Sequence, residues 1–556
     1  MISRAMNRQQ ISLVLLSLFM GALMRVDAQT ISAASCNASD VQKAFNAVTS
    51  STTTVSIPAG TCTWTTQVSL SVPSGNTSLS VLGAGSLSTT GGGDQTVIID
   101  NYASNSALLS IVTSSTSASY FRLAGITFEG GNGSVKNQGL INIGGSSANI
   151  RVDHVHTNTA TYNPAVASSG MQFTGCTYGV VDHSIIDAPS GSVNNGIREY
   201  NAGGCFGDSL GVGDQAWANS TSFGSANFLY VENNVFNNGA TNDCLFGGRF
   251  VERFNTFNMT GPPPSVQTHP TGSAGRIRGC RAQEVYQNAF NAASGNYLNA
   301  AIWINSGTAL VWGNTIPSSS AGGATGYQNF IELLSTRQNS ATYGQTAAPN
   351  GWGYCGTAFN GAGSNWDQNS SASAGYHCMD DAGRGQGDLL TGGFTSDGSG
   401  SNNVTNTATN CASSSACAYP RQASEPIYEW IDNYSLVPSN PSHLLADSEP
   451  TAHLNNVDYY LWCNASSQSG CTSFNGTAGV GSGTLAARPS TCTTGVAYWA
   501  TDQGNWNASG SGGQGELFVC SSTNSWTLFY TPYAYPHPLD TTQAGPTPPG
   551  NVQAAP

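Results

Sequence analysis

The stretch Val231-Glu232-Asn233-Asn234-Val235-Phe236 is one copy of a short unit that recurs along the chain. In this unit, a strand of β-branched or aromatic residues ends in a polar pair, and apolar residues follow. The other copies keep this order of residue types but lie at uneven distances from one another. They are Gly125-Ile126-Thr127-Phe128, Val152-Asp153-His154-Val155, Val181-Asp182-His183-Ser184-Ile185, Arg253-Phe254-Asn255-Thr256-Phe257, Val285-Tyr286-Gln287-Asn288-Ala289-Phe290 and Val311-Trp312-Gly313-Asn314-Thr315-Ile316.

The spacing of the copies is typical of a solenoid. Separations of 29, 29, 51, 21, 33 and 26 residues result when the equivalent positions are Gly125, His154, His183, Asn234, Asn255, Asn288 and Asn314. If the separation of 51 residues holds two turns, the mean is 27 residues per turn. Leucine-rich and ankyrin repeats keep their length more closely than this. A stack of parallel strands tolerates the variation, because loops between the strands can lengthen without disturbing the stack.

With these coils, the chain resembles the right-handed parallel β-helix proteins of the pectate lyase type. The resemblance rests on the Val-Asp-His and Asn-Xaa-Phe coils, on the Gly83-Ala84-Gly85 turn, and on an amphipathic helix followed by Ile57-Pro58-Ala59-Gly60-Thr61. It covers about residues 36–335 and, less clearly, the chain to about residue 475. It implies an all-β fold, a right-handed parallel β-helix, and an activity on polysaccharides.

The two ends of the predicted solenoid differ from its coils. Residues 38–48 predict a helix, which would cap the open end of the solenoid. Its apolar residues fall on one face: Val41, Ala44, Phe45 and Val48. Short strands near residues 496–499, 517–520 and 526–530 predict a small disulfide-closed β module.

These features divide the chain into four parts. Residues 1–28 predict a signal peptide, because Arg4 and Arg8 precede the apolar run from Ile11 to Met24, which is shorter than a membrane span, and a small residue, Ala28, stands at the expected cleavage point. We assign residues 29–487 to the parallel β-helix, with long disulfide-held loops at about 336–425. Residues 488–540 form the predicted module and a terminal strand, and the Pro- and Gly-rich residues 541–556 form a tail.

Charge is scarce and mostly acidic. Charged residues make up 8% of the chain, against about 25% in soluble domains. The 66 glycines and the many Ser, Thr and Asn residues disfavour helices. Without residues 1–28, the chain has 14 basic and 29 acidic residues, a net charge of −15. Nucleic acid and membranes are therefore not expected partners, since both attract basic surfaces. A secreted protein, extracellular or periplasmic, is expected, and its oligomeric state is left open.

The 14 cysteines are all beyond the signal peptide, as expected in an oxidising compartment. Short separations predict five disulfides: Cys36–Cys62, Cys355–Cys378, Cys411–Cys417, Cys463–Cys471 and Cys492–Cys520. The remaining four cysteines allow three connectivities, among which the sequence does not choose: Cys176, Cys205, Cys244 and Cys280. No cysteine has the spacing of a zinc site.

Basic residues gather in the central coils, where they predict a substrate site. Six of the 14 mature basic residues lie within 84 residues: Arg198, Arg249, Arg253, Arg276, Arg278 and Arg281. The guanidinium group matches a carboxylate, which favours a uronate-containing glycan. A ladder of Arg with Asp and Glu between neighbouring coils would explain the same residues structurally. We predict Arg276, Arg278, His269, Arg249 and Glu284 as catalytic, and Arg198, Arg253, Arg281 and Asp243 as substrate-binding.

The expected reaction is the β-elimination of an acidic polysaccharide. In this interpretation Arg276 or Arg278 neutralises the uronate, and His269 or an arginine removes the proton next to it. A glycoside hydrolase on the same scaffold is the nearest alternative, with Asp243 and Glu284 as the paired carboxylates. A non-catalytic, glycan-binding or adhesive surface solenoid is the third possibility. The motifs of polygalacturonases and alginate epimerases do not transfer to this chain, so the reaction class stays open.

No cofactor is firmly predicted, but Ca²⁺ is a possible one. Calcium-dependent pectate lyases use clustered acids and a basic residue, and Asp153, Asp182 and Asp243 could converge from different coils. Three histidines, His154, His156 and His183, also repeat at coil positions. A ladder of turn hydrogen bonds accounts for them, and a row of imidazoles and carboxylates would form if they face outward.

One coil departs from the pattern at Glu252, which stands where other coils have valine. A β-bulge would explain this departure and would turn Arg249 or Arg253 toward a cleft. Alternatively, the carboxyl group points inward and needs an arginine partner, because burying a lone carboxylate is costly. The bulge is the favoured interpretation.

Overall fold

The computed structural model describes most of the chain between residues 29 and 540. The described residues are 29–113, 119–163, 168–189, 194–200, 213–261, 264–269, 278–293, 295, 297–322, 325–334, 380–387, 422–437, 440–447, 453–464, 471 and 473–540. The predicted signal peptide and tail, most of the predicted loops at 336–425, and Arg276 lie outside the described residues.

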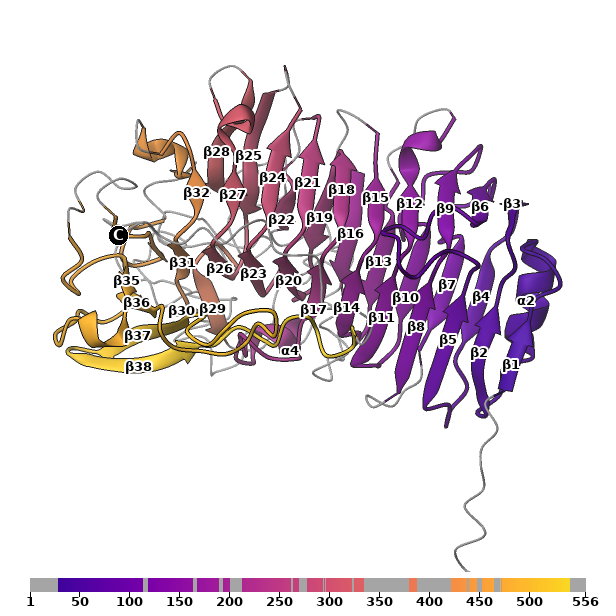
Figure 1. Cartoon of the computed structure of the whole chain (residues 1–556), viewed down its shortest axis with the longest axis horizontal. Coiled ribbons are helices and arrows are strands. Elements are labelled where there is room, and N and C mark those ends of the chain that lie inside the picture. The colour runs from indigo at the N-terminus through magenta and orange to yellow at the C-terminus, as the bar shows by residue number, and fades with distance from the viewer. Residues whose placement is uncertain are drawn as a thin grey trace, which may run out of the picture.

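Three long parallel sheets form the body of the molecule, and Figure 1 shows their strands stacked along its length. Sheet A contains β1 (Gln29–Ser32), β2 (Thr52–Ser56), β5 (Ser78–Leu82), β8 (Tyr120–Ala124), β11 (Asn149–Asp153), β14 (Gly179–Asp182), β17 (Leu229–Glu232), β20 (Arg249–Arg253), β23 (Ala282–Tyr286), β26 (Thr308–Trp312), β31 (Ile427–Trp430) and β34 (Tyr459–Tyr460). Sheet B contains β3 (Gly60–Trp64), β6 (Thr96–Asp100), β9 (Thr127–Gly130), β12 (His156–Asn158), β15 (Ile185–Asp187), β18 (Val235–Asn238), β21 (Thr256–Met259), β24 (Ala289–Ala292), β27 (Thr315–Ile316) and β32 (Asn433–Tyr434). Sheet C contains β4 (Val68–Ser71), β7 (Leu109–Val112), β10 (Ile141–Gly144), β13 (Met171–Thr174), β16 (Asn194–Tyr200), β19 (Ala240–Cys244), β22 (Val266–Thr268), β25 (Tyr297–Ile304), β28 (Gly326–Leu333) and β33 (Leu445–Asp447).

Each coil contributes one strand to each sheet in the order A, B, C. The alternation of side chains in a strand sends every second residue into the space that the sheets enclose. In β11, Ile150 and Val152 point into this core, and Arg151 and Asp153 point outward. The prediction of an all-β solenoid of parallel strands is therefore confirmed.

The turn from sheet A to sheet B contains a ladder of asparagine side chains. The backbone N–H of Asn234 donates to Asn255 Oδ1 at 2.9 Å, and Asn255 N–H donates in the same way to Asn288 Oδ1 at 3.0 Å. The ladder continues through Asn314 to Asp432. Inside the solenoid, these side chains form hydrogen bonds with backbone groups of the turns, which have no partner in a neighbouring strand.

The predicted alignment of the coils is wrong by one residue at His154 and His183, which it places with Asn234. His154 and His183 have left-handed backbone with φ of 53° and 49°, and their equivalent in the next coil is Asn233, with φ of 59°. The equivalent of Asn234 is Ser184, whose N–H donates to Asn234 Oδ1. The histidines therefore precede the ladder, and their side chains point outward.

The predicted division of the longest separation into two turns is also wrong. β14 pairs directly with β17, so one coil contains all the residues between them. Its extra length lies between β16 and β17 and includes the short helix α4 (Asp214–Trp217). This insertion packs on the outside of sheet A, where Trp217 is fully buried.

The bulge predicted at Glu252 is absent from the described strands. β20 pairs in regular register with both neighbours, Glu252 lying opposite Val231 and Val285. The side chain points into the core, with no exposed area, and its partners are amides and not the predicted arginine. Asn242 Nδ2 donates to Oε1 at 2.6 Å, and Asn255 Nδ2 donates to Oε2 at 3.1 Å. Burial raises the pKa of Glu252 well above its usual value, which favours the neutral acid.

Other elements lie at the two ends of the sheets (Figure 1). The helix α2 (Ala38–Asn46) lies beside β3 and β4, and its face of Val41, Ala44 and Phe45 is buried. At the other end, a four-stranded sheet contains β35 (Val480–Gly483), β36 (Ala497–Ala500), β37 (Glu516–Ser522) and β38 (Ser525–Tyr530). A two-stranded antiparallel sheet contains β29 (Arg384–Gly387) and β30 (Gln422–Ser424).

After β38, residues 531–540 run back along the outer face of sheet A, and we call them the C-terminal strap (Figure 1). Arg253 donates to the carbonyl oxygens of Tyr533 and Ala534 at 2.8 and 2.9 Å. Arg151 donates to Leu539 O at 3.1 Å and to Asp540 Oδ1 at 2.7 Å. The strap is thus held by arginines from separate coils of the solenoid.

The described residues contain four complete disulfides. Cys36–Cys62, Cys463–Cys471 and Cys492–Cys520 confirm predicted pairs, and Cys244 bonds to Cys280. The other two predicted pairs, Cys355–Cys378 and Cys411–Cys417, lie outside the described residues. Among the described helices, none has the length and apolar character needed to cross a membrane.

Candidate functional site

The outer face of sheet C contains a row of polar side chains in strict register. Backbone pairing aligns one residue from each of six consecutive strands: Asn142, Gln172, Arg198, Asp243, Gln267 and Trp303. Their neighbours in sequence, such as Ile197 and Cys244, point into the core. Consecutive strands lie about 4.8 Å apart, so the row is a track of regularly spaced polar groups along the solenoid.

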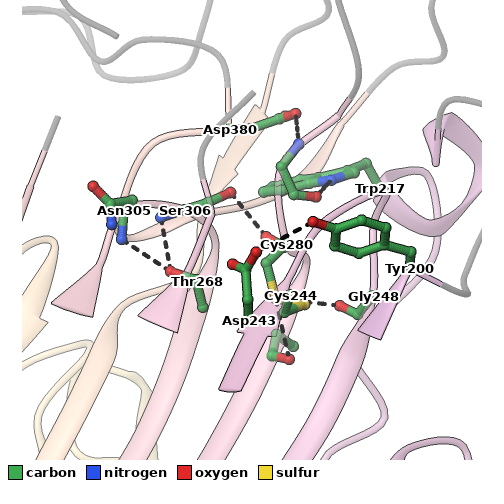
Figure 2. The surroundings of a disulfide bond; sticks show 12 residues. Tyr200, Trp217, Asp243, Cys244, Gly248, Thr268, Cys280, Asn305, Ser306 and Asp380 are labelled. Carbon is green, nitrogen blue, oxygen red and sulfur yellow. Dashed lines mark hydrogen bonds between the residues drawn. A yellow bond between two sulfur atoms is a disulfide. The ribbon is translucent and has the colours of Figure 1, made fainter. Parts of the chain in front are cut away.

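Four functional side chains meet in the middle of this track. Arg198 and Tyr200 come from β16, Asp243 comes from β19, and His269 directly follows β22. Tyr200 Oη donates a 3.2 Å hydrogen bond to Asp243 Oδ2, as Figure 2 shows. The guanidinium of Arg198 lies 5.8 Å from the centre of the Tyr200 ring and donates to Asn137 O at 2.7 Å. We call these four residues the sheet C cluster.

Burial shifts the pKa values of two residues of the sheet C cluster. Burial raises the pKa of Asp243, although the nearby charges of His269 and Arg198 and the Tyr200 hydrogen bond oppose the shift. Burial and the adjacent Asp243 raise the pKa of Tyr200, so the phenol keeps its proton. A carboxyl group with a raised pKa beside a cation is a common feature of sites that exchange protons.

The backbone beneath the cluster is tightly held. The Cys244–Cys280 disulfide joins β19 to the residues before β23, next to Asp243 (Figure 2). His269 N–H donates to Cys244 O at 2.8 Å, and Cys280 N–H donates to His269 O at 3.1 Å. Thr268 Oγ1 accepts hydrogen bonds from the N–H groups of Asn305 and Ser306. His269 therefore sits on backbone that is fixed on both sides.

Arg278 lies close to this region but is engaged elsewhere. Its guanidinium is fully buried and binds the Asp380 carboxylate through Nε and Nη2, at distances of 2.7–3.1 Å. The face of Trp217 lies 5.1 Å away. Asp380 Oδ2 also accepts from Gly279 N–H, so this ion pair fixes the backbone beside Cys280 (Figure 2).

Glu284 and Arg253 point out of sheet A, away from the sheet C cluster. Tyr530 Oη donates to Glu284 Oε2 at 2.6 Å, and Gly224 N–H donates to Oε1 at 2.8 Å. Arg253 is bound to Glu232 and to the C-terminal strap. Because Asp243 points out of sheet C, it forms no carboxylate pair with Glu284 across one cleft.

Arg249 and Arg281 hold the insertion before β17 against sheet A. Arg249 donates to the carbonyl oxygens of Ala216 and Thr221, both at 3.0 Å. Arg281 Nη2 lies 2.8 Å from Glu425 Oε2. Burial and the charge of Arg281 lower the pKa of Arg249 to about 10. Arg281 thus pairs with an acid, as the structural interpretation expects, whereas Arg249 binds backbone carbonyl oxygens of the insertion.

The predicted site residues therefore fall into separate groups. The sheet C cluster contains Arg198, Asp243 and His269, whereas Arg249, Arg253, Arg281 and Glu284 lie under the segments that cover sheet A. Tyr200 was not predicted, and the alternation Arg198-Glu199-Tyr200 is the signal that could have revealed it, because residues two apart in a strand share a face.

The three aspartates considered for Ca²⁺ do not converge. Asp153 and Asp182 are neighbours on sheet A, while Asp243 is on sheet C. Asp182, His183 and Asp540 do lie together and could offer metal ligands. Arg151, however, contacts both Asp182 and Asp540, at 2.8 and 2.7 Å. The arginine already pairs with both carboxylates, so this group is better explained as an ion-pair network.

His154 and His183 form the outward row of imidazoles and carboxylates that the sequence left as an alternative. The two rings stack with centroids 5.2 Å apart. His154 Nδ1 lies 2.8 Å from Asp153 Oδ2, and His183 Nδ1 lies 3.4 Å from Asp182 Oδ2. The row lies at the end of the C-terminal strap.

Comparisons with known proteins add no functional assignment. No protein-family model matches the chain, and no curated protein matches it either.

Proposed function

We propose that this protein is a secreted polysaccharide lyase that cleaves a uronate-containing glycan on the outer face of sheet C. The observation that carries the proposal is the sheet C cluster, in which three successive coils bring together an arginine, a phenol, a carboxyl group and an imidazole. A right-handed β-helix with α2 as its cap is part of this proposal, and the right-handed preference of parallel crossovers supports it.

The residues of the cluster supply the groups that β-elimination needs. Arg198 pairs with the uronate carboxylate and stabilises the negative charge that develops when the adjacent carbon loses its proton. His269 accepts that proton, and the electron pair forms a carbon–carbon double bond as the glycosidic oxygen leaves. The Asp243 and Tyr200 pair donates a proton to the leaving oxygen. The proposal thus assigns the uronate to Arg198, since Arg278 is bound to Asp380 and Arg276 is not described.

The rest of the track fits an extended sugar chain. Asn142, Gln172 and Gln267 carry amides, which both donate and accept hydrogen bonds, as sugar hydroxyls do. Asn142 is half-buried, and Gln172 and Gln267 are buried, so they offer a sugar only the edges of their side chains. Trp303 adds an aromatic surface at the other side of the cluster. One long face with regular spacing suits a linear polymer better than a compact ligand.

The decisive experiment is a screen of polyuronates and neutral glycans with the mature chain. Ultraviolet absorbance of the new double bond is measured together with reducing ends. We expect both signals on a polyuronate, and we expect both to fall at least about 100-fold in R198A and H269A. The control is N291A, which removes an amide from the outer face of sheet B in a neighbouring coil.

The alternatives give different results in the same screen. Reducing ends without absorbance would identify a hydrolase, and binding without either product would identify a glycan-binding solenoid. Full activity in R198A and H269A would place the active centre elsewhere.

A further inference from the structure

A separate pocket of about 570 Å³ lies between the four-stranded C-terminal sheet and the end of sheet A. Its walls come from the insertion before β17, from β31 and β34, and from β37 and β38. Pockets of about 300–1,000 Å³ hold small organic ligands. This pocket opens on the sheet A side of the solenoid, whereas the sheet C cluster lies on another face.

Aromatic rings from different parts of the chain line the pocket. Phe529 lies 5.8 Å from Tyr428 and 6.2 Å from Phe223, measured between ring centres. Tyr460 stacks on Tyr428 with centres 5.3 Å apart. These distances allow offset and edge-to-face contacts, so a further ring entering the pocket would meet the same favourable geometry.

The mouth of the pocket exposes apolar side chains to solvent. Phe529 is 43% exposed and Val457 is 42% exposed, although both are large apolar residues. Apolar side chains that gather around a concave site mark a binding surface more often than isolated ones do.

Three polar side chains in the pocket wall are already engaged with the protein. Tyr428 Oη donates to Gly495 O at 2.9 Å, and Asn456 Oδ1 accepts from Gly479 N–H at 2.6 Å. Thr308 Oγ1 donates to Pro426 O at 2.9 Å. A ligand rich in hydroxyl groups would therefore gain few hydrogen bonds from them, which favours an apolar ring.

The pocket wall offers an anion no unpaired cation among the described lining residues. Glu425 is the charged lining residue among those described. Its carboxylate accepts from Arg281 at 2.9 Å and from Gln386 N–H at 2.9 Å. Because Glu425 and Arg281 neutralise each other, an anionic ligand would lose its hydration in the pocket without gaining a free cation.

We propose that this pocket binds an uncharged aromatic ring carried by a small molecule. The site is independent of the sheet C cluster, so it can exist whether or not the protein cleaves a glycan. The probes are methyl benzoate, benzoate and methyl glucoside, which separate an uncharged ring, a charged ring and a sugar.

Titration calorimetry and ligand-observed NMR with the full mature chain test the proposal. We expect methyl benzoate to bind, and benzoate to bind at least about fivefold more weakly, because its carboxylate would lose hydration without gaining a free cation. V457R and F529A should each weaken binding of methyl benzoate at least about tenfold. V112R is the matched control, because Val112 is an equally exposed valine on β7, outside the pocket.

Several outcomes would overturn the proposal. They are no binding of methyl benzoate by the unaltered protein, equal or tighter binding of benzoate, preference for methyl glucoside, or equal effects of V457R and V112R. Melting curves establish that each variant is folded, and F529A decides the test if V457R is unstable.

Discussion

Glu284 Oε2 accepts a 2.6 Å hydrogen bond from Tyr530 Oη, although the two residues are 246 positions apart in the chain. The bond joins the outer face of sheet A to the end of β38, where the C-terminal strap begins. Burial raises the pKa of Glu284 to about 7, and the bonds from Tyr530 and Gly224 only partly oppose the shift. A fully buried acid therefore helps to hold the C-terminal sheet against sheet A.

We expect the stability of the protein to fall as the pH rises from about 4.5 to about 7. In this window the folded state keeps the proton on Glu284 while the unfolded state releases it, so each pH unit costs up to about 1.4 kcal/mol. E284Q should remove the contribution of Glu284, while that of Glu429, whose pKa burial also raises to about 7, remains. Y530F should extend the contribution of Glu284 to higher pH. Urea unfolding at pH 5 and pH 8 measures both effects, with E129Q as the control. Equal pH dependence in E284Q and the unaltered protein would contradict this assignment.

The fold was largely predictable from the sequence because it depends on a local repeat. Strand, polar pair and apolar residue recur in each coil, and the core needs only that the apolar positions align. The alignment failed by one residue at His154 and His183. In the turn, a residue with left-handed backbone is followed directly by a ladder residue. Asparagine occurs at both positions, as Asn233 and Asn234 show, whereas the histidines occupy only the first.

The candidate site was less predictable because its residues are separated by whole coils. Arginine is concentrated in the central coils, but the sequence does not show which of these arginines lie on sheet A and which on sheet C. On sheet A, Arg253 and Arg281 pair with acids beneath added segments. Only the register of the sheets shows that Arg198 and Asp243 are neighbours.

Glu252 should be replaceable by glutamine but not by alanine. Its carboxyl accepts hydrogen bonds from Asn242 and Asn255 inside the core, and its raised pKa favours a neutral group. E252Q keeps the volume and a carbonyl acceptor, whereas E252A leaves a cavity and an unpaired amide. We expect E252A to lower the free energy of unfolding by about 2–5 kcal/mol. Urea denaturation at neutral pH compares the two, and equal losses would show that the hydrogen bond to Asn242 is unimportant.

The C-terminal strap should depend on Arg151 more than on Asp540. Arg151 contacts both Asp182 and Asp540, so R151M would leave two carboxylates without their cation in a buried place. We expect a loss of about 3–5 kcal/mol in R151M. D540N should cost less because Arg151 keeps Asp182 as a partner. Chemical denaturation gives the free energies, and limited proteolysis reports release of the strap. A greater loss in D540N than in R151M would contradict the assigned order.

Tyr200 should control the alkaline limb of the pH profile if Asp243 is the proton donor of the proposed lyase. The hydrogen bond from Tyr200 opposes the rise in the pKa of Asp243 that burial causes. Y200F removes this bond, so Asp243 should keep its proton to higher pH, and the alkaline limb of kcat/KM should move upward. D243N should lower kcat/KM by at least about 100-fold and remove that limb. The profile is measured on the polyuronate that the screen identifies, with N291A as the control. An unchanged alkaline limb in Y200F would exclude Asp243 as the titrating acid, because its hydrogen-bond partner would then have no influence on the reaction.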